Sequence, residues 1–133
     1  MDDRKAERLR NLHRSLNQEL HVEGGIYVPE EEIEELCEQF ISQLSPLKVY
    51  LFGSFADGTG KKTSELDFYI VMRDGTGNLA DLTTQAYRSI RRVKRRPVDI
   101  IVGTESRFGE RCSMPTIESE VARKGVLLYG ESI

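Results

Sequence analysis

The strongest constraint on this sequence is a short apolar segment that ends at Gly53-Ser54. Residues 49–52 have the length and apolar character of a buried strand. Glycine lets the backbone turn sharply and approach a ligand closely, and Ser54 is then expected to open a helix. Because the start of a helix offers free N–H groups and, here, a hydroxyl, the sequence predicts an anion site suited to nucleotide phosphates.

Two acidic residues follow at the head of the next apolar segment. Ten residues separate Ser54 from Glu65, and Leu66 alone separates Glu65 from Asp67. Residues i and i+2 of a strand point to the same face, so both carboxylates are expected to project together. Carboxylate oxygens at this spacing suit a hard divalent cation such as Mg²⁺.

A third acid, Asp99, interrupts the apolar segment at residues 98–102. A charged group inside a buried strand needs a partner to offset its desolvation, and a metal ion is one such partner. If this strand lies beside the one that begins near Asp67, Asp99 faces the same cleft as Glu65 and Asp67. Three carboxylates beside a phosphate turn suit two-metal nucleotidyl or phosphoryl transfer.

The remaining pattern predicts an α/β fold with a small mixed β-sheet flanked by helices. The 133 residues suffice for one substantial core. Pro29 and Ser45-Pro46 bound one expected helix, Asn78 caps a second that runs into the basic residues before Pro97, and Thr116 caps a third that ends at Gly125. Strands are expected at residues 49–52, 65–72 and 98–102, residues 126–129 are expected to form a last strand or a packed tail, and residues 103–115 are expected to be a loop.

The first 27 residues are predicted to form an N-terminal helical extension to a main domain at residues 28–133. Leucines at positions 9, 12, 16 and 20 recur at helical spacing. If they do not pack on the domain, they form an apolar stripe that is available to a partner.

Composition narrows the compartment and the class of partner. A net charge of −3 argues against a general nucleic-acid binder. No apolar run approaches the ~20 residues needed to cross a bilayer, and the N-terminus is charged where a signal peptide is apolar. We therefore expect a cytoplasmic protein without a membrane segment and without a disulfide between Cys37 and Cys112.

Charge is nevertheless distributed unevenly along the chain. We expect two charged clusters to be solvated faces, with a docking surface for an oppositely charged partner, including RNA at the basic cluster, as the alternative. The acidic cluster comprises Glu30, Glu31, Glu32, Glu34, Glu35 and Glu38, and the basic one comprises Arg88, Arg91, Arg92, Lys94, Arg95 and Arg96.

The motif as a whole resembles that of a known superfamily. Gly53-Ser54, ten residues, an acid, one residue and Asp67, with an acid on a later strand, is similar to the GS-x10-D-x-D signature of DNA polymerase beta type nucleotidyltransferases. The short chain resembles the minimal nucleotidyltransferases, which are often encoded beside a helical HEPN-domain partner in toxin-antitoxin pairs. The resemblance covers roughly residues 30–129 and implies a polymerase beta palm-like fold.

The resemblance also implies a role for each motif residue. Gly53 and Ser54 would hold the triphosphate of ATP or another nucleoside triphosphate, Glu65 and Asp67 would bind Mg²⁺, and Asp99 would bind metal and assist deprotonation of an acceptor hydroxyl. The implied reaction is transfer of a nucleoside monophosphate, AMP from ATP, to a HEPN-type protein. Transfer to an antibiotic or another small molecule, with a homodimer completing the cleft, is an alternative.

Glu65 departs from the signature, which has aspartate at this position. The extra methylene moves the carboxylate outward by about 1 Å, a displacement that matters in a two-metal site. Glutamate still offers the required oxygens, so a catalytic site is our first prediction. A weak or inactive nucleotidyltransferase-like module that acts as an antitoxin by docking is the second.

Overall fold

The computed structural model describes Arg8 and residues 29–130. Its four strands form one mixed sheet in the order β3-β2-β1-β4, in which β1 is antiparallel to both neighbours and β2 is parallel to β3. The strands are β1 (Lys48–Phe52), β2 (Leu66–Met72), β3 (Val98–Thr104) and β4 (Val126–Tyr129). The small mixed sheet flanked by helices is therefore confirmed.

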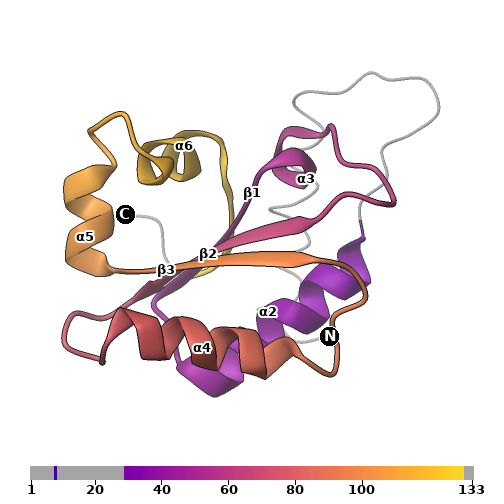
Figure 1. Cartoon of the computed structure of the whole chain (residues 1–133). Helices are drawn as coiled ribbons and strands as arrows, with labels where there is room; N and C mark the ends of the chain where they lie inside the picture. Colours follow the sequence, from indigo (N-terminus) through magenta and orange to yellow (C-terminus); the bar gives the residue numbers. More distant parts are fainter. Residues whose placement is uncertain (1–7, 9–28, 131–133) are drawn as a thin grey trace.

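Helices cover both faces of this sheet (Figure 1). Helices α2 and α4 pack on one face, α5 and α6 pack on the other, and the single turn α3 follows β1. Their bounds are α2 (Glu30–Leu44), α3 (Ser54–Asp57), α4 (Leu79–Ile90), α5 (Glu105–Arg111) and α6 (Ile117–Lys124). Among the helices that the structure describes, none is both long and apolar enough to cross a membrane.

Strand β2 separates the two cores because its alternate residues point to opposite faces. Phe68 and Ile70 belong to the larger core beneath α2 and α4, whereas Tyr69 and Val71 belong to the smaller core beneath α5 and α6. All residues from Phe68 to Met72 are buried. A strand covered on both faces has no reason to alternate in polarity, which explains its uninterrupted apolar sequence.

Two predicted helix caps are confirmed by hydrogen bonds. The Asn78 side chain accepts from the backbone N–H of Ala80 at 2.7 Å, and the Thr116 hydroxyl accepts from the N–H of Ser119 at 3.2 Å. Helix α4 nevertheless ends at Ile90, so most of the basic cluster lies in the connection to β3 rather than on the helix.

The prediction of a loop over residues 103–115 was wrong, because this segment contains α5. The Thr104 hydroxyl caps the helix by accepting from the N–H of Arg107, and Phe108 packs 5.4 Å from the Tyr50 ring and 5.3 Å from the Tyr69 ring. A seven-residue helix with one aromatic anchor is too short to produce a periodic apolar pattern. Tertiary packing of Phe108 therefore supplies the stability that the short helix α5 lacks by itself.

The expectation of a solvated face was wrong for much of the acidic cluster, in which Glu32 and Glu34 are buried, but it holds for the basic cluster, in which only Arg96 is partly buried. Glu32 pairs with Arg96 at 2.9 Å, Glu35 pairs with Arg95 at 2.9 Å, and the buried guanidinium of Arg8 contacts Glu34 and Glu38. The acidic helix is thus largely neutralised within the chain. A second set of basic residues, Arg88, Arg91 and Arg92, lines a shallow depression at the end of α4.

Arg96 connects three parts of the fold. Besides its pairing with Glu32, the guanidinium donates to the carbonyl oxygens of Lys62 at 3.0 Å and Ser64 at 3.2 Å, and it lies 5.3 Å from the centre of the Phe55 ring. The Arg96 and Glu32 side chains are only 11% and 5% exposed. Arg96 therefore fixes the segment that leads into Glu65 against α2 and α3.

Several predictions fall on residues outside the described part of the chain. These include the helical extension over residues 1–27, the boundary at residue 28 and the apolar stripe of leucines. Within the described residues, Cys37 is buried and Cys112 is partly buried, and both are free thiols.

Removing the Arg96 guanidinium should destabilise the fold. We expect Arg96→Met to lower the free energy of unfolding by about 3 kcal/mol, because it leaves the buried Glu32 carboxylate without its ion pair. Urea denaturation measures this change. Arg91→Met, at an exposed position of the same cluster, is the matched control, and we expect a change within about 0.5 kcal/mol.

The double variant Glu32→Gln/Arg96→Met tests the assigned cause. It should recover part of the lost stability, because it replaces a buried unpaired charge with a neutral amide. If Arg96→Met alone unfolds at the same urea concentration as the wild type, the pair does not support the fold in this way.

Candidate active site

Pairing of the two parallel strands brings Asp67 and Asp99 together. In the register of β2 and β3, Asp67 is the partner of Asp99, so both project from the same face near the beginning of their strands. Asp67 shares its face with Tyr69 two residues later, which is the face covered by α5 and α6. The condition set in the sequence analysis, that the third apolar strand lies beside the second, is therefore met.

Gly53 lies directly against the carboxylate of Asp67. It follows Phe52, the residue of β1 that pairs with Asp67, and a Cβ atom at this position would lie 2.3 Å from Asp67 Oδ2. The φ angle of Gly53 is +79°, a conformation that favours glycine. Glycine is thus required at this position for two reasons: it adopts the turn conformation, and it leaves room for the Asp67 carboxylate.

Ser54 begins α3 directly after this turn, as the sequence predicts. The carbonyl oxygen of Gly53 accepts from the N–H groups of Ala56 and Asp57, both at 3.1 Å. Helix α3 contains only four residues, so its dipole is small. Any anion affinity of this turn would depend mainly on nearby N–H groups and the serine hydroxyl.

Glu65 lies one residue before β2, is exposed, and interacts with Asp67. Burial raises the pKa of Asp67 to about 6, and the charges of Glu65 and Asp99 and a hydrogen bond with Glu65 contribute in the same direction. Loss of a proton from Asp67 therefore creates repulsion among neighbouring carboxylates. A bound cation would relieve this repulsion.

The side chains are not, however, assembled into a ready metal site. Within Arg8 and residues 29–130, no group of three His, Cys, Asp or Glu side chains is arranged to hold a metal ion. The backbone brings Glu65, Asp67 and Asp99 to the starts of the adjacent strands β2 and β3, and their oxygens are the donors that a hard cation prefers. Their chemistry fits a divalent cation, but their side chains would have to converge to bind one.

Tyr87 is a residue of this site that the sequence analysis missed. Its hydroxyl donates to Asp99 Oδ1 at 3.2 Å and accepts from the backbone N–H of Ile100 at 3.0 Å. Tyr87 is 40% exposed and belongs to α4, so it orients the carboxylate of Asp99 from the adjacent helix. An aromatic residue within an amphipathic helix gave no signal for this role.

A cavity of about 230 Å³ adjoins Gly53 and Asp67. Its described lining includes three residues of α6 that the sequence analysis did not consider, and it does not include Glu65 or Asp99. The lining consists of Phe52, Gly53, Asp57, Asp67, Ile117, Glu120 and Lys124. The spacing of the last three residues is typical of one helix face, but nothing in the sequence indicates that this face meets Asp67.

Replacing Asp67 should increase stability at neutral pH. The folded-state pKa of about 6 exceeds the ordinary value of 3.8, so the native state binds more protons between these values, and its stability falls as pH rises through 6. We expect Asp67→Asn to remove this loss and to be more stable at pH 7 by about 1–2 kcal/mol, after allowance for solvent screening.

Urea denaturation from pH 4.5 to 7.5 in EDTA measures this difference without a bound cation. The free energy of unfolding of the variant minus that of the wild type should grow as pH rises toward the folded-state pKa of about 6 and level off above it, because the variant cannot ionise at position 67. A difference that stays constant with pH would contradict the assigned pKa. Asp81→Asn, at an exposed position in the first turn of α4, serves as the control.

Comparison with solved structures supports this fold. A protein from Sulfolobus solfataricus described as a candidate nucleotidyltransferase is 22% identical, with a TM-score of 0.50 over 98% of this chain and 91% of that chain. A toxin-antitoxin structure with AMP-PNP is 20% identical, and a mutant of the toxin-antitoxin MntA-HpeT is 22% identical. Each of these two has a TM-score of 0.46 over 79% of this chain and 76% of that chain, too low to support an argument.

The sequence itself matches a family. No curated protein sequence matches the chain significantly. Residues 30–128, however, match the family model described as a nucleotidyltransferase domain. This range includes the turn at Gly53-Ser54 and all three predicted site acids. The chain therefore belongs to the nucleotidyltransferase domain family.

Proposed function

We propose that this protein transfers AMP from ATP to a hydroxyl group of an acceptor and releases pyrophosphate, with Mg²⁺ as its cofactor. The observation that carries this proposal is the pairing of Asp67 with Asp99, with Gly53 against the Asp67 carboxylate. A nucleotidyl transfer site needs a phosphate-binding turn beside acids that face one reaction centre. The backbone around these three residues is consistent with that requirement.

The triphosphate would bind at the turn between β1 and α3. Gly53 permits close approach of the nucleotide because it has no side chain. The backbone N–H and hydroxyl of Ser54, at the first position of α3, would donate to phosphate oxygens. The cavity on this side of Asp67 would receive part of the nucleotide.

Glu65, Asp67 and Asp99 would hold Mg²⁺, because hard carboxylate oxygens are the ligands that this ion prefers. When bound, Mg²⁺ neutralises phosphate charge and polarises the bond to the leaving group. The raised pKa of Asp67 is consistent with this role. Neighbouring carboxylates repel one another, and binding of either a proton or a cation relieves that repulsion.

Asp99 would accept the proton of the acceptor hydroxyl. The resulting oxygen forms a bond to the α-phosphorus of ATP, the bond from this phosphorus to the oxygen that bridges the α- and β-phosphates breaks, and pyrophosphate leaves. Tyr87 would hold the Asp99 carboxylate in position through its hydrogen bond to Oδ1. The acceptor would then lie on the β3 side of the site and the nucleotide on the β1 side.

We further propose that the acceptor hydroxyl belongs to a HEPN-type protein. The similarity of the motif to that of minimal nucleotidyltransferases supports this partner. A small-molecule acceptor is the competing choice, and transfer of AMP to an antibiotic in place of the partner protein would favour it.

Loss of either Asp67 or Asp99 should strongly reduce the rate of AMP transfer. We expect Asp67→Asn and Asp99→Asn each to reduce the rate at least about 100-fold, because each would remove a metal ligand and Asp99→Asn would also remove the base. The measurement is label transfer from ATP labelled at the α-phosphate to the protein encoded beside this gene, in the presence of Mg²⁺. Asp81→Asn should transfer at the wild-type rate.

The position of the label gives a second criterion. Label at the γ-phosphate should leave with pyrophosphate, so its appearance on the partner would indicate phosphoryl transfer and contradict the proposal. Wild-type protein that transfers no label, yet inhibits its partner as well as Asp67→Asn does, would instead identify a non-catalytic docking module. Glu65, which stands where the family signature has aspartate, is the observation that favours this second candidate.

Glu65→Asp tests the departure from the family signature. We expect this variant to transfer AMP at the wild-type rate or faster, because aspartate places a carboxylate nearer the strand, where the family motif has it. The same label-transfer assay measures the rate. A loss of several hundredfold, about 3 kcal/mol or more, would mean that the surroundings have adapted to glutamate and would contradict this expectation.

A further inference from the structure

Helix α6 brings a basic side chain to the cavity at the candidate site. Lys124 lines this cavity together with Gly53 and Asp67, although it is far from both in the sequence. It is the one basic residue in the described lining, and three acids, Asp57, Asp67 and Glu120, line the same space. An anionic ligand in this cavity would therefore meet repulsion from the acids and attraction from Lys124.

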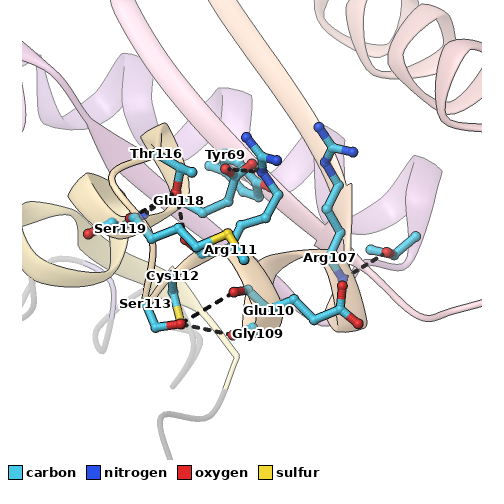
Figure 2. Close-up of polar contacts among 12 residues, drawn as sticks. Tyr69, Arg107, Gly109, Glu110, Arg111, Cys112, Ser113, Thr116, Glu118 and Ser119 are labelled. Carbon is cyan, nitrogen blue, oxygen red and sulfur yellow. Dashed lines mark hydrogen bonds and ion pairs between the residues drawn. The ribbon is translucent and has the colours of Figure 1, made fainter.

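A buried hydrogen-bond network fixes α6 in this orientation. Figure 2 shows Glu118 between Tyr69 of the central strand and Arg111 of α5. Glu118 is buried, and its carboxylate accepts from Tyr69 Oη at 2.8 Å and from Arg111 Nε at 2.9 Å. Because Glu118 points into the protein, the rotation of α6 about its axis is set, and the face that carries Lys124 lies at the cavity.

The backbone of β3 leaves room for this network. A Cβ atom on Gly103 would lie 2.2 Å from Tyr69 Oη, so a larger residue would displace the hydroxyl from Glu118. The Thr116 side chain accepts from the N–H of Ser119 and so caps α6 at its start. The helix that carries Lys124 is therefore held by a cap and by the buried Glu118 carboxylate.

Lys124 itself is available to a ligand. Its ammonium group lies 4.0 Å from Glu120 Oε1, and the two side chains are 69% and 56% exposed. An exposed ion pair at this distance contributes little stability, so the ammonium group can turn toward another anion at small cost. A lysine binds phosphate as a mobile point charge, without the fixed geometry that arginine requires.

We propose that Lys124 binds the polyphosphate of the nucleoside triphosphate that the Gly53-Ser54 turn receives. This inference rests on the proposed function and adds a residue of α6 that lines the same cavity. A triphosphate carries several negative charges into a space that is lined by acids. Lys124 supplies the positive charge that the turn itself, with its single helical turn α3, does not.

Isothermal titration of ATP and AMP in the presence of Mg²⁺ tests this role in the full-length protein. Lys124→Ala should weaken ATP binding about 10- to 100-fold, as expected for the loss of a hydrogen bond to a charged group. The loss for AMP should be smaller, because AMP carries fewer phosphates. Lys124→Arg should restore most of the ATP affinity, and Arg123→Ala, at the exposed neighbouring position, should bind ATP as the wild type does.

Glu120→Gln separates a direct role from an indirect one. If Lys124 acts only by holding Glu120, Glu120→Gln should reproduce the loss seen in Lys124→Ala, and that result would overturn the proposal. If Lys124 binds phosphate directly, Glu120→Gln should bind ATP at least as tightly as the wild type, because it removes a competing carboxylate. Circular dichroism should give the same helix content for all four variants.

The outcomes distinguish this proposal from the proposed function. Wild-type protein that binds ATP and transfers label, together with Lys124→Ala that binds ATP with wild-type affinity, would overturn only the role of Lys124. Wild-type protein that binds no ATP would overturn both. A loss in Lys124→Ala that is equal for ATP and AMP would contradict a polyphosphate contact.

Discussion

The parallel pairing of β2 with β3 is the interaction on which the candidate site depends. Its register sets Asp67 opposite Asp99, and the antiparallel pairing of β1 on the other side of β2 sets Gly53 against Asp67. A shift of one residue in either pairing would turn the affected side chain to the opposite face of the sheet. The buried core formed by alternate residues of these strands opposes such a shift, so the apolar interior also preserves the geometry of the acids.

This geometry concentrates negative charge where water is partly excluded. The pKa of Asp67 rises because burial and neighbouring acids both disfavour its ionised form. Contacts with the surrounding helices maintain the arrangement: Arg96 ties the segment before Glu65 to α2, and Tyr87 of α4 holds the Asp99 carboxylate. Arg96 and Tyr87 thus hold carboxylates close together although these carboxylates repel one another. Such an arrangement is expected of a site that binds a cation or a proton.

Local sequence patterns predicted most of the strands and helices but not the contacts between elements that are distant in the sequence. The apolar runs, Asn78 and Thr116 indicated their strands and helices correctly, because strand burial and capping depend on neighbouring residues. Helix α5 escaped notice because its stability depends on Phe108 packing between two tyrosines of different strands. The acidic cluster was expected in solvent because Glu32 and Glu35 pair with basic residues about 60 positions away, and a local sequence pattern does not reveal such a distant ion pair.

The sequence by itself determined the order of the four strands, the glycine turn, the three acids and the helices other than α5 that the structure describes, because spacing and polarity depend on local backbone geometry. It also determined the family, through a match that includes this motif. Only the tertiary structure decided that Asp67 pairs with Asp99, that Tyr87 contacts Asp99, and that Lys124 shares a cavity with Asp67. These relations depend on how distant elements pack against one another, and that packing is selected by the shape of the whole core.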